Sequence, residues 1–524
     1  MASHIATLCK LLALLVLALT VSAQTAPRPS TGNTGAAVAP SAPRSSGGRK
    51  NLVFSYYMRQ DTGVQPWDTP GNAVTHVIWS FATILQDGTV TLQGPSSPAG
   101  SILYSNAVER TLGYMDNKQC NCQGDCLKGE LWQMFLLKQK YPHLKTILSV
   151  GGWTWSDNFS VAMGTAAGRQ RAIDTSIAMA ETYGFDGLDI DWEFPGNADK
   201  AKDPTFPDFK FGPNDLNNAG QFFKDARTAF DAKGHGDWSL SFAVSGSAWY
   251  SGSWANVISF VDYIFVMSYE FQHHMTTSYG GAALMSVPGD DSITTTNVVS
   301  YGLQTFAQVG FPKEKIIMGL PLYGNGWNNI PKTFNWKEGK PGFGAPVSEK
   351  TATEPTSYSV LLKKFATDGN WIASPDLKRG TVVYYNGSQV WFLDSPDTIR
   401  TKTQYLMQQG YGGIMLWNSN QDSLDPNLSL ITAMQSVFPI DNSTARATPF
   451  CLPSSQTRYC NLHCGYVPPA GISTSKPMSN ASQTSTFGGM ADTSSKTSAA
   501  VESLARGSVL LGALMALVVM VIIA

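Results

Sequence analysis

The feature that most constrains this chain is a short stretch, Phe185 to Glu193, in which acidic and apolar residues alternate. A period of two is typical of a strand whose two faces meet different surroundings. Asp189, Asp191 and Glu193 therefore share one face, whereas Asp186 has the opposite parity. The other face is apolar and would pack against a covering layer, as in a parallel sheet; it comprises Leu188, Ile190 and Trp192.

Three ionised carboxylates on one strand face repel each other wherever the surroundings are less polar than water. We therefore expect the cluster of Asp189, Asp191 and Glu193 to hold at least one proton at neutral pH and to titrate as a coupled unit. A carboxyl group that keeps its proton is what general acid catalysis requires.

Two other interpretations of the acidic stretch fit less well. In a calcium-binding EF-hand loop that began at Asp189, the sixth residue would be Gly and the twelfth Glu, but they are Phe194 and Lys200. In a solvated acidic edge, both faces of the strand would meet water, and Ile190 and Trp192 are poor choices for such a strand. The pattern therefore favours a chemical site.

Residues 186–193, Asp-Gly-Leu-Asp-Ile-Asp-Trp-Glu, resemble the D-x-x-D-x-D-x-E signature of glycoside hydrolase family 18, the chitinases. The resemblance extends from Asn51 to about Phe438, through further motifs in the order in which that family places them. These motifs are Val53–Tyr57, Thr75–Ala82, Ser149–Trp153, Met267–Glu270 and Gly412–Trp417.

Apolar, β-rich runs recur along the chain with helical stretches between them, which favours a parallel sheet with crossover helices. The runs are Leu52–Tyr57, His76–Ala82, Lys145–Val150, Gly187–Trp192, Ser239–Val244, Tyr263–Met267, Ile316–Leu320 and Gly413–Trp417. This pattern and the family resemblance both predict an α/β fold, a (β/α)8 TIM barrel with its chemistry at the carboxyl ends of the strands.

The interval between the seventh and eighth runs is too long for one crossover helix. It contains two further strand-like runs, Thr381–Tyr385 and Val390–Leu393. We therefore predict a small α+β insertion at about residues 325–400, which in the family raises one wall of the substrate groove.

The resemblance implies specific roles at the site. Glu193 would donate a proton to the leaving oxygen, and Asp191 would orient the 2-acetamido group of the sugar, which in this family attacks its own anomeric carbon. Asp189 would share a proton with Asp191, Tyr269 would donate a hydrogen bond to the acetamido oxygen, and Asp186 would support the strand. The expected substrate-binding residues are Trp417, Met267, Glu270, Trp153, Tyr57, Gly152 and Asp186.

Several assignments leave alternatives open. Trp153 and Tyr57 fit ordinary core packing as well as stacking on sugar rings. Glu270 stands where the family has Asp, and Asn325 stands where many relatives have Arg, so the contacts of both residues differ from the family pattern. His273 and His274 read as loop histidines, and we expect neither a metal nor another cofactor.

The acetamido mechanism requires an N-acetylated substrate, which points to chitin and its oligomers, cleaved with retention of configuration. The chain has 37 basic and 38 acidic residues, and this balance favours a neutral polymer over nucleic acid. The alternatives are an endo-β-N-acetylglucosaminidase acting on N-glycans and a non-catalytic chitin-binding wall protein. We expect a monomer.

The sequence at both ends of the chain indicates an extracellular protein. Residues 1–23 resemble a secretory signal peptide, and residues 24–50 form a linker rich in Pro, Ser and Gly. After the catalytic region 51–440, a Ser/Thr-rich tail at 441–508 leads to an apolar stretch at 509–524, which reaches only about 24 Å as a helix. This arrangement matches a glycosylphosphatidylinositol (GPI) anchor signal, with a short membrane span as the alternative.

Cysteines and sequons fit secretion. Cys9 would leave with the signal peptide, and the other six cysteines are expected to form disulfides, with a zinc site as the alternative. These are Cys120, Cys122, Cys126, Cys451, Cys460 and Cys464. N-glycosylation sequons begin at Asn158, Asn386, Asn427, Asn442 and Asn480.

Overall fold

A computed structural model describes residues 51–58, 66–92, 127, 129–197, 202, 209–247, 250, 252–271, 282–285, 297–330, 339–342, 344, 351–440, 451–452 and 459–462. The predicted signal peptide, linker and hydrophobic tail lie outside these residues, as do His273, His274, Cys464 and the first three cysteines of the catalytic region.

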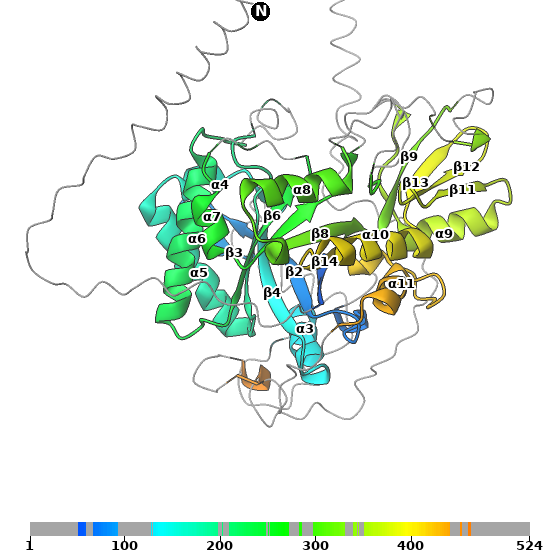
Figure 1. Ribbon diagram of the computed structural model, residues 1–524. Coiled ribbons are helices and arrows are strands. Elements are labelled where there is room, and N and C mark those ends of the chain that lie inside the picture. The colour runs from blue at the N-terminus through cyan, green and yellow to red at the C-terminus, as the bar shows by residue number, and fades with distance from the viewer. Residues whose placement is uncertain are drawn as a thin grey trace, which may run out of the picture. The chain divides into compact units, whose positions relative to one another are not determined.

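Eight parallel strands close into a barrel in the order β1-β14-β8-β7-β6-β5-β4-β2, and β2 pairs with β1 (Figure 1). A short antiparallel strand, β3 (Val90–Thr91), extends β2 at one edge. The barrel strands are β1 (Leu52–Met58), β2 (His76–Ile84), β4 (Lys145–Gly151), β5 (Gly187–Asp191), β6 (Ser239–Ser245), β7 (Tyr263–Met267), β8 (Ile316–Pro321) and β14 (Gly413–Trp417). The predicted TIM barrel is confirmed, and its strand ends lie within two residues of the prediction: β2 continues to Ile84, and β5 ends at Asp191, one residue earlier than expected.

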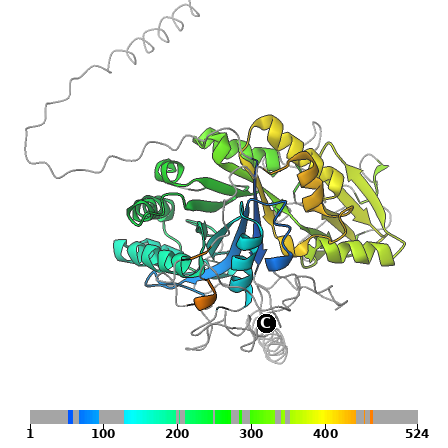
Figure 2. The same cartoon turned by 90° about the horizontal axis from the view of Figure 1, so that it is seen from below.

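Helices surround the barrel on its outside, as the view along the barrel in Figure 2 shows. Their inner faces pack on the outward-facing residues of the strands, including Leu188 and Ile190 of β5, as the alternation predicts. Trp192 stacks on Phe159 with 5.2 Å between ring centroids. The described helices are α3 (Gly129–Lys140), α4 (Phe159–Met163), α5 (Ala166–Tyr183), α6 (Asp215–Ala232), α7 (Ala255–Phe260), α8 (Val299–Val309), α10 (Pro396–Gln409) and α11 (Leu430–Val437).

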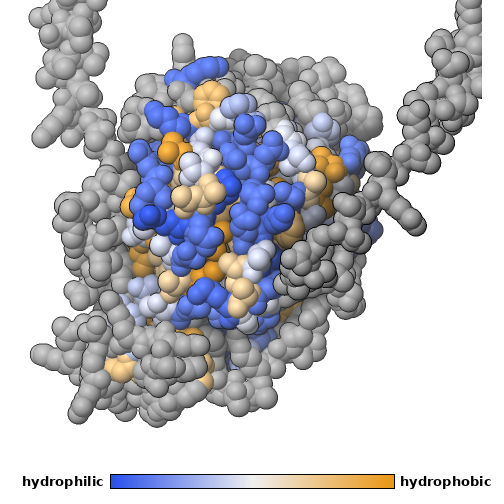
Figure 3. Space-filling view, turned by 90° about the vertical axis from the view of Figure 1, so that its left-hand side faces the viewer, coloured by the Kyte–Doolittle hydropathy of each residue, from blue (hydrophilic) through white to orange (hydrophobic). Residues whose placement is uncertain are grey.

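The barrel interior is filled by a separate set of buried side chains from alternate strand positions. On β1 these are Phe54 and Tyr56, whereas Val53 and Tyr57 belong to the outer core. The side of the molecule that carries α4 to α7 is mostly hydrophilic with scattered apolar residues (Figure 3), as expected for helices whose outer faces meet water.

The predicted α+β insertion is present between β8 and β14. It is a five-stranded antiparallel sheet in the order β10-β9-β13-β12-β11 with one helix, α9 (Tyr358–Thr367). Its strands are β9 (Tyr323–Trp327), β10 (Thr356–Ser357), β11 (Ile372–Asp376), β12 (Thr381–Tyr385) and β13 (Val390–Leu393). The sheet has a small core of its own, centred on Val383, Val390 and Phe392.

Cys451 and Cys460 are each disulfide-bonded, and the Leu452 amide donates a 3.0 Å hydrogen bond to the Leu462 carbonyl. Tyr459 stacks on Tyr183, the last residue of α5, with 6.0 Å between centroids. Because α5 leads into the start of β5, this segment lies at the amino ends of the barrel strands. None of the helices in the described part of the chain is long and apolar enough to cross a membrane.

Candidate active site

The acidic residues of β5 lie inside the barrel toward the carboxyl ends of its strands. Asp189 is fully buried, Asp191 is 3% exposed, and Glu193 follows the end of the strand and is partly exposed. The three residues therefore form a series from the barrel interior to its mouth. Glu193 is the carboxyl group that a bound molecule can reach most easily.

Asp189 is held by three hydroxyl groups, two from the adjacent strands β4 and β6 and one from β1. Tyr56 and Ser149 each donate a 2.6 Å hydrogen bond to Oδ2, and Ser241 donates a 2.8 Å bond to Oδ1. Burial raises the pKa of Asp189, although these hydrogen bonds oppose the rise. The raised pKa agrees with the expectation that the cluster retains a proton, and the burial of Asp189 prevents it from touching a substrate.

The backbone around Glu193 is fixed from the loop that follows β4. The Glu193 amide donates a 2.9 Å hydrogen bond to Ser156 Oγ, and this hydroxyl donates to the Gly152 carbonyl at 2.9 Å. The Gly152 amide in turn donates to the Asp191 carbonyl at 2.7 Å. Gly152 has φ +83°, and a Cβ there would lie 2.7 Å from the ring of Phe81. Gly152 thus shapes the backbone of the site.

Tyr269, two residues after the end of β7, lies beside the acids. Burial raises the pKa of its hydroxyl well above the ordinary value, and the negative charges of Asp191, Glu270 and Glu193 raise it further. Tyr269 therefore stays protonated at neutral pH and can donate a hydrogen bond. Met267 ends β7 and packs against the interior cluster of the barrel.

Glu270 has a left-handed backbone conformation, with φ +57°. Its Oε1 accepts a 2.6 Å hydrogen bond from the hydroxyl of Tyr323, the first residue of β9. The longer side chain that replaces the family Asp is thus tied to the insertion. Burial and the charge of Glu270 both raise the pKa of Tyr323, which therefore remains the donor.

Two tryptophans, at the ends of β14 and β4, have different surroundings. Trp417 is partly buried, with its ring edge-to-face on Tyr56 at 5.2 Å and stacked on Phe81 at 5.8 Å between centroids. It thus lies over the interior cluster that contains the Asp189 site. Trp153 is more exposed, with 42% of its surface accessible.

Two predicted substrate-binding residues lie away from the catalytic cluster of Asp189, Asp191 and Glu193. Tyr57 points out of the barrel, is fully buried, and donates a 3.2 Å hydrogen bond to Glu130, so the prediction that it stacks on a sugar is wrong. Asp186 precedes β5 at the amino end of the barrel, roughly 16 Å of strand from Asp191. It pairs with Lys138 at 2.7 Å and accepts from the Thr146 amide at 2.8 Å; its support of the strand is observed, but substrate contact is not possible.

The structure adds site residues that the sequence did not single out. Tyr56, Ser149 and Ser241 surround Asp189, and the inward parity of each strand is the signal that could have found them. Tyr250 follows β6, accepts a 2.7 Å hydrogen bond from the Ser245 amide, and has its pKa raised by burial and by Glu193 and Asp191. Its place in a loop left no periodic signal.

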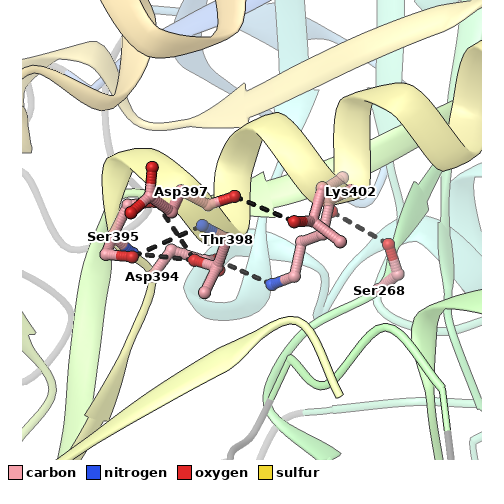
Figure 4. A network of polar contacts seen from close by, with 8 residues as sticks. Ser268, Asp394, Ser395, Asp397, Thr398 and Lys402 are labelled. Carbon is pink, nitrogen blue, oxygen red and sulfur yellow. Dashed lines mark hydrogen bonds and ion pairs between the residues drawn. The ribbon is translucent and has the colours of Figure 1, made fainter. Parts of the chain in front are cut away.

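A small cavity lies where the insertion meets the barrel. Its lining includes Tyr269, Tyr323, Asn325, Asp394 and Lys402. Asp394, just before α10, and Lys402, in the middle of that helix, form a buried ion pair with 2.7 Å between Oδ2 and Nζ, and Thr398 also donates to Asp394 at 2.7 Å (Figure 4). Asn325 therefore lines the same cavity as Tyr269 and this ion pair.

Within the described ranges, no group of three or more His, Cys, Asp or Glu side chains could hold a metal ion. What the site does provide is one partly exposed acid, a buried carboxylate pair behind it and protonated tyrosines around it, at the carboxyl ends of barrel strands. This arrangement is that of a glycosidase on a TIM barrel.

The profile of glycosyl hydrolases family 18 matches residues 53–422. "Endochitinase 1" of Metarhizium robertsii is 30% identical over 394 residues, which cover 73% of this chain and 84% of that protein. "Chitinase 1" of Aphanocladium album is 28% identical over 407 residues, covering 76% and 88%. The chain therefore belongs to glycosyl hydrolases family 18.

The fold agrees with solved structures of similar proteins. The crystal structure of Ostrinia furnacalis Group IV chitinase aligns with a TM-score of 0.59 at 24% identity, covering 74% of this chain and 99% of that one. At this level of identity the comparison supports the barrel architecture alone.

Proposed function

We propose that this protein hydrolyses the β-1,4-linkages between N-acetylglucosamine units of chitin, with retention of configuration and with help from the substrate's own acetamido group. The observation that carries the proposal is the placement of the acids. Glu193 is accessible, whereas Asp189 is fully buried under three hydroxyls and cannot act as a nucleophile toward the anomeric carbon.

In the proposed reaction, Glu193 gives its proton to the glycosidic oxygen as the bond from this oxygen to the anomeric carbon breaks. The acetamido oxygen bonds to the same carbon, and Asp191 stabilises the positive charge that develops on the acetamido group. The hydroxyl of Tyr269 orients the acetamido oxygen by donating a hydrogen bond. Water then opens the cyclic intermediate, with Glu193 as the base, and the configuration is retained.

The substrate class is supported by the family and by the names of the relatives, which are those of chitinases and endochitinases. Trp417 supplies an apolar surface at the ends of the strands, and Trp153 an exposed ring. Neutral sugar rings pack well on such aromatic faces.

Digestion of chitotetraose, followed by chromatography and by NMR of the fresh products, tests the proposal. The wild-type protein should release β-anomers, and Glu193→Gln should lose at least about 10²-fold in kcat. Asp186→Asn, at the other end of the same strand, is the matched control and should retain kcat. Inverted products, or full activity of Glu193→Gln, would refute the mechanism. Cleavage of a high-mannose glycoprotein but not of chitotetraose would indicate the endo-β-N-acetylglucosaminidase, and chitin binding without turnover a wall protein.

We also propose that the protein is secreted and held at the cell surface by a GPI anchor, where it acts on wall chitin. The disulfide-bonded state of Cys451 and of Cys460 supports an oxidising compartment. The apolar residues 11–21 and 509–524 have the composition of a signal peptide and an anchor signal. A phosphatidylinositol-specific phospholipase should release the protein from intact cells; retention after treatment would favour a membrane span.

A further inference from the structure

Outside the reacting groups, Asp215 stands out as a buried carboxylate at the start of α6. It is 2% exposed, and three donors surround it. Ser160 Oγ donates to Oδ1 at 2.8 Å, while the amides of Gly196 and Gly212 donate to Oδ2 at 3.0 and 2.8 Å.

These hydrogen bonds differ from those of an ordinary acid at a helix start. Such an acid usually accepts from the amides of its own first turn. The three bonds of Asp215 instead lead away from the helix, to α4 and to two points of the chain between β5 and α6. Asp215 therefore ties other segments together.

One of the tied segments carries Glu193. Gly196 lies three residues after Glu193, in a turn closed by a 3.0 Å hydrogen bond from the Asn197 amide to the Phe194 carbonyl. On the other side, the Glu193 amide is bound to Ser156 Oγ at 2.9 Å. Both ends of the short segment from Glu193 to Gly196 are thus fixed.

The hydrogen bonds that fix the two ends of this segment both lead to residues at or near the start of α4. Ser156 lies three residues before the start of α4, and Ser160 is in its first turn. Ser156 binds the amide of Glu193 directly, and Ser160 holds the Gly196 end through the carboxylate of Asp215. If Asp215 were removed, the partly buried amides of Gly196 and Gly212 would lose their acceptor, and the Gly196 end of the segment would lose its connection to α4.

We propose that Asp215 is a positioning residue for the general acid: it holds the segment after Glu193 so that the carboxyl group reaches the glycosidic oxygen. This inference rests on the proposed role of Glu193 as proton donor. General acid catalysis depends closely on geometry, and a misplacement of about 1 Å can cost on the order of 10²-fold in rate.

The test compares two substrates whose leaving groups differ in their need for a proton. A sugar hydroxyl must be protonated as it leaves chitotetraose, whereas 2,4-dinitrophenol leaves a chitobioside as a stable anion. For Asp215→Ala we expect kcat/KM to fall about 10- to 100-fold on chitotetraose and at least about tenfold less on the dinitrophenyl chitobioside. A loss of equal size on both substrates would overturn the proposal.

Three further variants make the test decisive. Asp215→Asn can still accept from both glycine amides and donate to Ser160, so it should stay within about threefold of wild type on both substrates. Ser160→Ala removes only the hydrogen bond from α4 to Asp215, and its loss of kcat/KM should be about threefold larger on chitotetraose than on the dinitrophenyl chitobioside. If Ser160→Ala shows no such difference, the proposal is overturned, even if Asp215→Ala does not fold. Asp262→Ala removes a carboxylate at the amino end of β7, where it accepts from the Leu240 amide at 2.9 Å, and should show no substrate difference.

Glu193→Gln, measured on the same two substrates, separates the two hypotheses. It should show the largest difference between them, about 10²-fold or more. If it shows none, the proposed donor is wrong. If it shows the difference and Asp215→Ala does not, only the positioning role of Asp215 fails.

Discussion

Removing the hydroxyl of Tyr56 tests whether the buried Asp189 serves catalysis. Tyr56→Phe deletes a 2.6 Å hydrogen bond to Asp189 Oδ2 and leaves the ring against Trp417 and Phe265. A hydrogen bond to a charged acceptor is worth about 1.5–3 kcal/mol. If all of it is felt in the transition state, kcat falls about 10- to 150-fold, since about 1.4 kcal/mol is a factor of ten.

The same substitution should shift the pH dependence. The Tyr56 hydrogen bond lowers the pKa of Asp189 against the larger, raising effect of burial, so its loss raises that pKa further. Because the Asp189–Asp191 pair must lose one proton to stabilise the positive charge, the acidic limb of the kcat profile should move to higher pH. Steady-state kinetics on chitotetraose from pH 3 to 8 measures both effects.

Tyr57→Phe is the matched control on the same strand. Its hydroxyl also donates to a buried carboxylate, Glu130, at 3.2 Å, but it does so outside the barrel. Urea denaturation should show a lower free energy of unfolding for both variants, whereas kcat should fall for Tyr56→Phe alone. An equal loss of kcat in Tyr57→Phe, or an unchanged kcat and pH profile in Tyr56→Phe, would refute the reasoning.

Two other predictions concern residues farther from the acids. Trp153→Ala removes an exposed ring, so thermal unfolding should change little while KM for chitohexaose rises about 3- to 30-fold; unchanged KM would contradict a role in binding. In the insertion, burial raises the pKa of Asp376, but hydrogen bonds from Arg379 and Lys340 outweigh it and the pKa ends below its usual value. A lowered folded-state pKa stabilises the fold above the unfolded pKa, and the effect is lost as pH falls through the folded value. Asp376→Asn should therefore cost about 1–3 kcal/mol at pH 7 and less at pH 3 in urea denaturation, and equal costs would contradict the assignment.

Much of the fold was predictable because the barrel strands are apolar runs separated by helical stretches. The two strands of the insertion between Thr381 and Leu393 were found in the same way. In β5, the alternation itself separated Asp189 and Asp191 from Leu188 and Ile190, since acids and apolar residues cannot exchange faces without a large cost.

The errors arose in segments that lack this contrast between a polar and an apolar strand face. In β1 both faces are buried, so Tyr56 and Tyr57 are both aromatic residues in an apolar run, and nothing local shows which one points inward. Asp186 is part of the acidic motif, but it lies at the other end of the strand from Glu193. Tyr250 and Asp215 act through loops, and their contacts depend on the three-dimensional arrangement of segments distant in sequence.

The stacking of Tyr459 on Tyr183 determines where a mechanical load enters the domain. Force applied to the chain beyond Leu462 would pass first to this pair of rings, and then through α5 to the amino ends of the barrel strands. The loops at the opposite pole would stay unloaded. Tension from a polymer bound at the carboxyl ends of the strands and tension on the C-terminal tail would thus act on different parts of the molecule.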